Sequence, residues 1–226
     1  MKKRVDTLVN LAILALAASA TLAGCSIAPP RPDEDNDDGL VRVETAMLDE
    51  LYVAPNVSLA NYRRVMLDPI EVTFKKDWRK DHPEMRDKEF EELRKRLAAM
   101  LRENLLTELA HGGYVIAEAP AKDVLHLHAT LEDVDLAAPE TAPDKKTLAY
   151  TNGDMTLRVK GFDAPSGALV ARARDYEADP ESRMLEHADR ISANIAARKI
   201  FEKWAEALRS ALDVAKVSAG ARQPQS

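Results

Sequence analysis

The sequence predicts an α+β domain, in which a mixed or antiparallel sheet of about five strands carries two long amphipathic helices on one face. Two observations indicate this class. The predicted elements follow the order strand, helix, several strands, helix, and each helix has a single apolar stripe. Two helices of this kind bury their stripes best on the same side of a sheet whose strands alternate apolar and polar residues.

The first predicted strand spans residues 62–74. Its apolar side chains have opposite parity on the two sides of Pro69, as shown by Val65 and Leu67 before it and Ile70, Val72 and Phe74 after it. A proline cannot donate a ladder hydrogen bond, and one added residue reverses the facing of a strand. We therefore expect a β-bulge at Pro69.

The clearest helix spans residues 83–110. Its apolar stripe consists of Phe90, Leu93, Leu97, Leu101, Leu105 and Leu109. Asp81 and Glu84 have the spacing of a capping box at the start of this helix. Gly112 and Gly113 are expected to end it, because glycine readily adopts the backbone conformations that terminate helices.

Four more strands are predicted after this helix, because apolar and polar residues alternate in them. They span residues 114–118, 123–136, 154–162 and 168–176. The last two strands are joined by Asp163-Ala-Pro-Ser-Gly167, which has the composition of a hairpin loop.

The second helix is expected to begin at Asp179 and Pro180, a pair that suits an N-cap and a first helical position. Its apolar stripe consists of Met184, Ala188, Ile191, Ile195, Phe201, Trp204, Leu208 and Leu212. The stripe predicts that Trp204 belongs to the core. Residues 217–226 have no apolar pattern and are predicted to form a disordered tail.

The composition excludes several classes of protein. The chain has 226 residues, a formal net charge of −6 at pH 7 and one cysteine. A single cysteine rules out an intramolecular disulfide framework and a cysteine-rich metal site. The acidic balance argues against nucleic acid as a partner. The sequence has no nucleophile elbow, phosphate loop or His-Glu-x-x-His motif, so we expect a non-catalytic protein.

Residues 1–24 have the layout of a secretory signal peptide, with three basic residues before an apolar run from Leu8 to Ala20. The run is shorter than the ~20 apolar residues of a membrane span. It leads into Leu22-Ala-Gly-Cys25, which resembles the lipobox of bacterial lipoproteins. The alternative is an ordinary signal peptide that happens to contain a cysteine.

The lipobox resemblance implies that Cys25 is lipidated, with palmitate-like acyl chains, and becomes the first residue of the mature protein. This covalent lipid is the only added group that we expect, and it makes the membrane the first partner. In lipoproteins of enteric-type bacteria an Asp after the cysteine favours inner-membrane retention, whereas Ser26 follows Cys25 here. The resemblance therefore implies the periplasmic face of the outer membrane rather than the inner membrane.

We expect residues 25–45 to form a flexible, acidic tether and residues 46–216 to form a single periplasmic domain. The alternative for the tether is a calcium loop, because Asp33, Asp35, Asp37 and Glu44 have the spacing of EF-hand ligands. This loop needs a glycine at the place of Asp38, so the composition favours the tether.

The segment Tyr62-Arg-Arg-Val-Met-Leu-Asp-Pro69 is the most specific part of a longer resemblance. Weaker matches are the residues from Leu51 onward, Asp123-Val-Leu-His-Leu127, Ser166-Gly167 and the helix of Trp204. Over roughly residues 50–215 the chain resembles a family of proteobacterial lipoproteins with a domain of unknown function. The resemblance implies an envelope lipoprotein domain and no catalytic residues.

Strand parity predicts a basic sheet face opposite the helices. The residues that share this face are His126, His128, Arg158, Lys160, Arg172 and Arg174. Such a face would suit an envelope protein or an anionic envelope component as partner. The alternative is an ordinary solvated face, on which the bases pair across strands with acids such as Glu132.

His126 and His128 are two positions apart on one strand, so both project from the same face. Two imidazoles in this arrangement can bind a metal ion, but a third ligand is needed, and Glu132 lies farther along the strand. We therefore expect two solvent-facing histidines and no metal site.

Two other features have both a functional and a structural interpretation. Trp78 lies in a basic segment, where an exposed ring would contact a partner or a glycan, but a ring packed on its own domain is favoured. Glu132 with Asp133 or Asp135 would suit acid–base chemistry, but adjacent strand residues face opposite sides. The sequence thus predicts a lipid-anchored binding or adaptor domain, with a periplasmic enzyme or metal-binding protein as the alternative.

Overall fold

One mixed sheet of eight strands is present in the computed structural model, which describes residues 39–83, 85–136, 154–178 and 190–220. All of these residues belong to one compact unit, residues 35–226. The strands are β1 (Val41–Arg42), β2 (Glu50–Val53), β3 (Arg64–Leu67), β4 (Glu71–Phe74), β5 (Val115–Ile116), β6 (Val124–Asp135), β7 (Asp154–Asp163) and β8 (Leu169–Ala178). The predicted α+β class is confirmed, because two long helices accompany this sheet.

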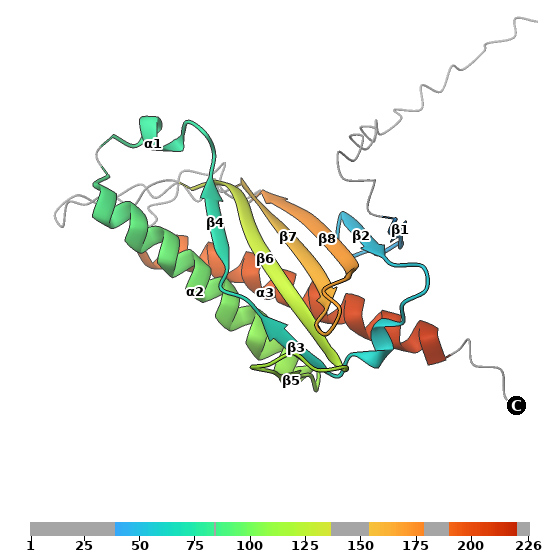
Figure 1. Ribbon diagram of the computed structural model, residues 1–226. Coiled ribbons are helices and arrows are strands. Elements are labelled where there is room, and N and C mark those ends of the chain that lie inside the picture. Colours follow the sequence, from blue (N-terminus) through green and yellow to red (C-terminus); the bar gives the residue numbers. More distant parts are fainter. Residues whose placement is uncertain (1–38, 84, 137–153, 179–189, 221–226) are drawn as a thin grey trace, which may run out of the picture. The chain divides into compact units, whose positions relative to one another are not determined.

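Strand β6 is the branching point of the sheet (Figure 1). The strand order is β1-β2-β8-β7-β6-β3-β5, and β4 pairs with β6 beyond the end of β3. β6, β7, β8, β2 and β1 are antiparallel neighbours, whereas β3 and β4 run parallel to β6. The predicted number of about five strands is too low, because the short strands β1 and β2 were not predicted and the predicted strand over residues 62–74 is two strands, β3 and β4; the strand predicted over residues 114–118 is present as β5.

The predicted strand over residues 62–74 is divided into β3 and β4. Val65 and Leu67 are buried in β3, and Ile70 and Val72 are buried beyond the break, so the predicted change of parity is confirmed. The change is achieved by interrupting the strand rather than by a bulge within it. The Asp68 amide still donates to the Leu127 carbonyl at 3.1 Å, which holds the connection against β6.

The helix of the leucine stripe is α2 (Asp87–His111), and it starts later than the predicted residue 83. Its capping box is formed by Arg86 and Glu89, so the predicted cap at Asp81 is wrong. Asp81 instead ends a separate short helix, α1 (Trp78–Asp81). This turn lets Trp78 pack against Phe74 and Phe90 and become 99% buried, leaving 1% of its surface exposed.

The predicted end of α2 is confirmed. Gly112 is the C-cap, and Gly113 has a φ of +78°, a conformation that favours glycine. Beyond it, the Tyr114 amide donates to the Leu109 carbonyl at 3.0 Å. The buried side of α2 consists of Leu93, Leu97, Leu101, Leu105 and Leu109, as the stripe predicted.

The second long helix is α3 (Arg190–Gly220), and the other helical turn is the 3-10 helix η1 (Leu59–Asn61). Phe201, Trp204, Leu208 and Leu212 of the predicted stripe are buried in the core. The predicted start at Asp179 and Pro180, with Met184 and Ala188, lies outside the described residues. The helix extends to Gly220, into the segment that was predicted to be a disordered tail.

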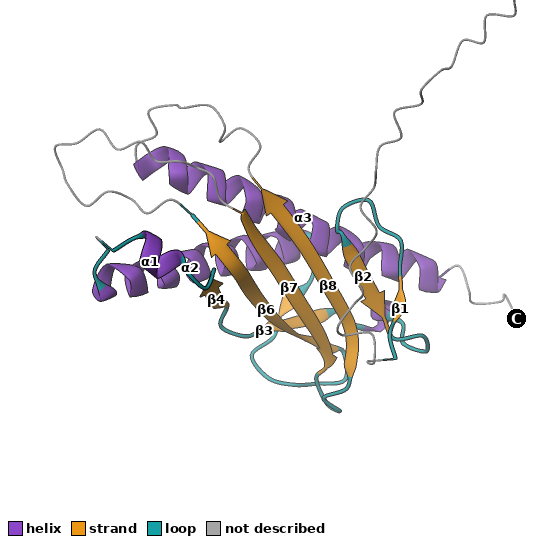
Figure 2. Ribbon diagram, turned by 90° about the horizontal axis from the view of Figure 1, so that it is seen from above, coloured by secondary structure: helices purple, strands orange, loops and turns teal. Residues whose placement is uncertain are grey.

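Both long helices lie on one side of the sheet (Figures 1 and 2). We call this side the covered face; it presents Leu125, Leu127, Ala129, Leu131, Leu157, Val159 and Ala173 to the core. We call the opposite side the open face. The buried leucines of α2, the buried aromatics of α3 and the covered face form one hydrophobic core.

The hairpin between β7 and β8 has the predicted loop. The Gly167 amide donates to the Asp163 carbonyl at 2.8 Å, and Gly167 has a φ of +69°. The Tyr62 hydroxyl, from the segment before β3, donates to Asp163 Oδ1 at 3.1 Å. Burial and this hydrogen bond raise the pKa of Tyr62 to about 12.

The N-terminal predictions concern segments that are not described. The signal peptide, Cys25 and the first three aspartates of the candidate calcium loop all lie within residues 1–38, outside the described residues. Among the helices that are described, none combines the length and the apolar character needed to cross a membrane.

Candidate functional site

The open face brings the six predicted site residues together. Antiparallel register places His128 opposite Lys160 and Lys160 opposite Arg172. On one side of this row, Arg158 is opposite Arg174. On the other side of it, His126 is opposite Phe162. Directly opposed residues share a face of the sheet, so the shared facing predicted from strand parity is observed.

The arginines of this face have partners within the sheet. Arg158 Nε lies 3.1 and 3.2 Å from the two carboxylate oxygens of Glu132, and Arg174 Nη1 lies 3.4 Å from Glu50 Oε1. The Arg172 guanidinium lies 4.6 Å from the ring centroid of Tyr52, and only 5% of Arg172 is exposed. Acids therefore offset much of the positive charge, as the cross-strand alternative with Glu132 predicted.

Lys160 differs from these arginines. It is half-buried at the centre of β7, with His128 on one side and Arg172 on the other. Among the residues that the structure describes, no acidic group lies within ion-pair distance of Lys160. Within the described residues, the charge of its ammonium group is therefore not offset by an ion pair.

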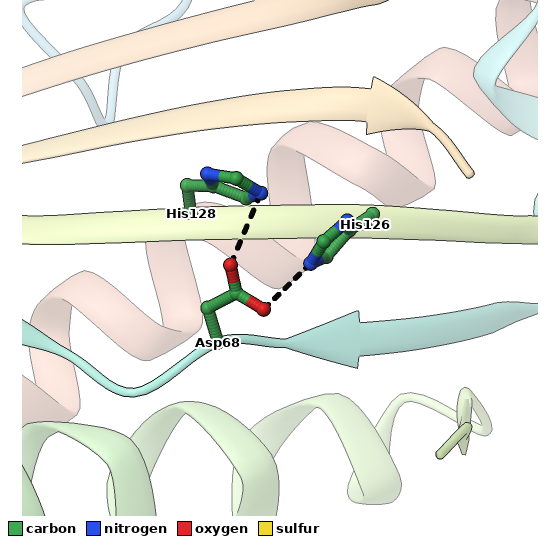
Figure 3. Close-up of side chains that lie close together, drawn as sticks. All are labelled: Asp68, His126 and His128. Carbon is green, nitrogen blue, oxygen red and sulfur yellow. Dashed lines mark hydrogen bonds and ion pairs between the residues drawn. The ribbon is translucent and has the colours of Figure 1, made fainter. Parts of the chain in front are cut away.

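A second cluster on this face joins Asp68 to the two histidines (Figure 3). His126 Nε2 lies 2.6 Å from Asp68 Oδ1, and His128 Nε2 lies 3.1 Å from Asp68 Oδ2. The imidazole rings are 4.4 Å apart, edge to face. Their side chains are 23% and 47% exposed, and that of Asp68 is 40% exposed, so solvent reaches all three groups.

Parallel pairing between β3 and β6 creates this cluster. Met66 is in register with His126 and Leu67 with Leu127, which brings the following residue, Asp68, beside His128. The ring of Phe162 on β7 lies 4.7 Å from the His128 ring and limits its movement on the other side. Two side chains come from one strand and the third from the end of its neighbour, so the backbone fixes all three.

The third member of the cluster was missed at the level of sequence. Glu132, which was considered as a third ligand and judged too far along the strand, binds Arg158. Asp68 fulfils that geometric role, and its ligand oxygens and the histidine nitrogens all lie within 4.8 Å of one another. One feature of the sequence could have indicated Asp68 as a candidate site residue: it lies in Tyr62–Pro69, the most specific segment of the family resemblance.

The acids at the far end of β6 serve the sheet. Asp133 has a φ of +52° where the register of β6 with β7 shifts, and it is exposed there. Lys75 Nζ binds Asp135 Oδ2 at 2.8 Å and Asp154 Oδ2 at 2.7 Å. These two hydrogen bonds raise the pKa of Lys75, with that from Asp135 contributing most. Asp135 is therefore tied to a lysine bridge rather than to Glu132.

The covered face contains a buried acid, Asp175, that was not predicted to have a role. Asp175 is 4% exposed and accepts hydrogen bonds from Trp204 Nε1 and from the Asp49 amide, each at 2.8 Å. Burial raises the pKa of its carboxyl, although the hydrogen bond from Trp204 acts in the opposite direction. Asp175 therefore joins β8 to α3, and Trp204 is a core residue as predicted.

Trp78 is also a structural residue. Its indole Nε1 donates to the Leu136 carbonyl at 2.7 Å, and its ring is 1% exposed and stacks on His82. A contact of this ring with a partner or a glycan is ruled out in this arrangement, and the favoured interpretation, packing on its own domain, is confirmed.

These features define the class of protein as an α+β domain with a helix-covered apolar face and an open polar face. The chain belongs to DUF3313, a family of proteins of unknown function whose model matches residues 35–208. The predicted membership of a family with a domain of unknown function is thereby confirmed. No curated protein is similar enough to this sequence to count as a relative.

Solved structures with a similar arrangement include a PelC dodecamer from Paraburkholderia phytofirmans, with 14% identity and a TM-score of 0.37. That match covers 68% of this chain and 96% of the other. A minor lipoprotein from Acinetobacter baumannii has 12% identity and a TM-score of 0.34, over 71% of this chain and 95% of the other. Similarities of this size carry no inference about function.

Proposed function

We propose that the protein is a lipid-anchored, non-catalytic binding domain of the cell envelope that recognises its partner through the open face. The observation that carries the binding role is the row on β6, β7 and β8 in which the half-buried Lys160 lies between the exposed His128 and Arg172, which is itself buried against Tyr52. Among the described residues, α2 and α3 occupy the covered face, whereas the open face exposes His128 and part of Lys160.

The electrostatics of the open face favour a specific partner over a general polyanion. Arg158 and Arg174 are held by Glu132 and Glu50, so these side chains are fixed before binding. Lys160, with no acid within ion-pair distance among the described residues, supplies the cation for an acidic protein surface or another anionic envelope component. Fixed, mixed charges of this kind give specificity more than affinity.

The proposed address rests on the N-terminal sequence. The apolar run before Leu22-Ala-Gly-Cys25 and its resemblance to a lipobox support lipidation of Cys25. Ser26 supports the periplasmic face of the outer membrane over the inner membrane. Stable anchoring takes two signals, such as dual acylation, and the lipobox resemblance implies several acyl chains.

Site-specific photo-crosslinking in intact cells tests the binding role. A photoreactive residue at Lys160 is expected to yield a discrete adduct with one envelope component. The matched control is the same residue at Lys95, which is exposed on α2. The same adducts at both positions, or none at Lys160, would contradict recognition through the open face.

Cys25→Ala tests the anchor separately. Without the thiol no acyl chain can be attached, so the variant is expected to accumulate as unprocessed or soluble protein. The measurement is fractionation of membranes, followed by mass determination of the N-terminus. A Cys25→Ala protein that is processed and stays in the membrane fraction like the wild type would overturn the lipid anchor, whatever the crosslinking shows.

A further inference from the structure

We propose that Asp68, His126 and His128 form a binding site for one divalent transition metal ion of the Zn²⁺ class. The inference goes beyond recognition through the open face and does not depend on it. It revises our expectation from the sequence that no metal is bound, because that expectation rested on the lack of a third ligand. The structure supplies this ligand as Asp68.

The donor set suits this class of ion. Imidazole nitrogen favours Zn²⁺, Ni²⁺, Cu²⁺ and Fe²⁺, whereas Ca²⁺ and Mg²⁺ take oxygen ligands. Two histidines and one carboxylate are a common set of three protein ligands for zinc, with a further position left open. The cluster contains these three groups without a cysteine, which agrees with a chain whose one cysteine is Cys25.

The distances allow an ion after a small adjustment. Metal–ligand bonds of about 2.0–2.2 Å at tetrahedral angles separate the ligand atoms by roughly 3.3 Å. Asp68 Oδ1 lies 2.6 Å from His126 Nε2, and Asp68 Oδ2 lies 3.1 Å from His128 Nε2. All three ligand atoms lie within 4.8 Å of one another, so side-chain rotations that bring their separations to roughly 3.3 Å would place an ion between them, with both Nε2 atoms as donors.

The backbone holds the ligands in place. His126 and His128 are fixed by the long strand β6, which pairs with β7 over almost its whole length. The backbone amide of Asp68 donates a hydrogen bond to the carbonyl of Leu127, and Leu127 is the residue between the two histidines. This bond holds Asp68 beside β6. A site on neighbouring strands loses little freedom when it binds an ion, which favours affinity.

The site is open on the solvent side. His128 and Asp68 are 47% and 40% exposed, so an ion can enter and a water molecule can occupy a remaining coordination position. Lys160 lies opposite His128 on β7. An anionic group bound at that position of the metal would therefore lie close to the Lys160 side chain.

A purely structural role for the cluster makes a different prediction. In that case Asp68 only ties the end of β3 to β6, and its contacts with the histidines affect stability alone. Metal ions would then leave the unfolding temperature unchanged. The two roles are separated by measuring metal binding and stability on the same variants.

The test uses the full chain without a histidine tag, purified in detergent and stripped of metal by a chelator. Zn²⁺ alone is titrated by calorimetry, and Co²⁺ is titrated by its visible absorption, which reports coordination geometry. We expect one ion per chain and a higher unfolding temperature with Zn²⁺. Asp68→Asn and His128→Gln are each expected to weaken the binding at least tenfold, in line with the loss of a ligand.

His128→Gln keeps the proposal testable if Asp68→Asn does not fold, because the His128 side chain is half exposed and Gln retains a hydrogen-bond donor. The matched control is His111→Gln, which removes another exposed histidine, one that lies 3.6 Å from a carboxylate oxygen of Glu108. This control is expected to bind like the wild type. Wild-type protein that binds neither ion, or His128→Gln protein that binds as tightly as the wild type, would overturn the site.

Discussion

Two aspartates on opposite faces of one sheet show how burial decides what a carboxylate does. Asp175 on the covered face and Asp68 on the open face each contact two nitrogen atoms, at distances between 2.6 and 3.1 Å. Asp175 is 4% exposed, and its partners are an indole and a backbone amide, neither of which titrates in the physiological range. Asp68 is 40% exposed, and its partners are imidazoles.

The two aspartates differ in whether their present contacts can be replaced by bonds to an incoming ion or water molecule. Asp175 is enclosed, so its hydrogen bonds contribute to stability and cannot be replaced by bonds to an incoming group. Asp68 and the histidines can exchange their mutual contacts for an ion or water, because solvent reaches all three side chains. Burial thus makes one aspartate a structural residue, while exposure leaves the other available for chemistry.

Asp175→Ala is the substitution with the largest expected effect. It leaves the buried Trp204 indole without its acceptor, which costs about 1–3 kcal/mol, and it also removes the acceptor of the Asp49 amide, which is only partly buried. Removal of a desolvated carboxyl offsets part of this cost, so we expect a net loss of about 2 kcal/mol in the free energy of unfolding. Urea unfolding measures it.

The comparison with Asp68→Ala makes this prediction specific to burial. Removing an exposed acid that contacts half-exposed partners is expected to cost less than about 1 kcal/mol. Equal losses for Asp175→Ala and Asp68→Ala, in the absence of metal, would show that burial does not separate the two aspartates.

The pH dependence of stability provides a second test. Burial raises the pKa of Asp175 above its ordinary value of 3.8. At a pH between the ordinary pKa of the unfolded chain and the raised pKa of the folded protein, the folded protein retains a proton that the unfolded chain has released. The free energy of unfolding therefore decreases as the pH rises from the lower pKa to the higher one. Asp175→Asn removes this titration. The unfolding free energy of the wild type, relative to Asp175→Asn, is therefore expected to fall with rising pH and then become constant.

Thermal or urea unfolding over a pH series measures this difference. Taking it relative to Asp175→Asn cancels the contributions of the other carboxyl groups, such as Asp123, whose pKa is lowered by Arg64. A difference that increases with pH, or that does not change at all, would contradict the raised pKa of Asp175.

The parts of the fold that depend on local pattern were predictable. Alternation gave the facing of His126, His128, Arg158 and Lys160, because side-chain parity is a property of each strand by itself. The stripes of α2 and α3 and the end of α2 at Gly112 likewise depend on neighbours in sequence. Strand β1, of two residues, has no pattern to read and was not predicted; it forms by pairing with β2.

The candidate metal cluster needed the tertiary pairing. Asp68 and His126 are 58 residues apart, and only the parallel register of β3 with β6 brings them together. The same holds for Asp175, whose partner Trp204 is on α3. An acid at an apolar parity, between Ala173 and Glu177 on β8, was visible in the sequence, but the donor that stabilises it was not. The sequence was therefore sufficient to predict which residues share a face of the sheet. The contacts of Asp68 and Asp175 depend on the pairing of segments that are distant in the sequence.

The smallest expected effect on stability belongs to Lys160→Glu. Lys160 has no acidic partner within ion-pair distance among the described residues, so the reversal breaks no ion pair there. The new carboxylate would face Arg172 and His128 across the strands, which offsets the change in solvation. We expect the free energy of unfolding to change by less than about 0.5 kcal/mol.

If the open face binds an anionic group, the same variant is expected to lose most of the crosslinking that a probe on β7 detects. A Lys160→Glu protein with unchanged stability and unchanged crosslinking would therefore count against the role of this cation, while Lys95→Glu on α2 controls for the change in net charge.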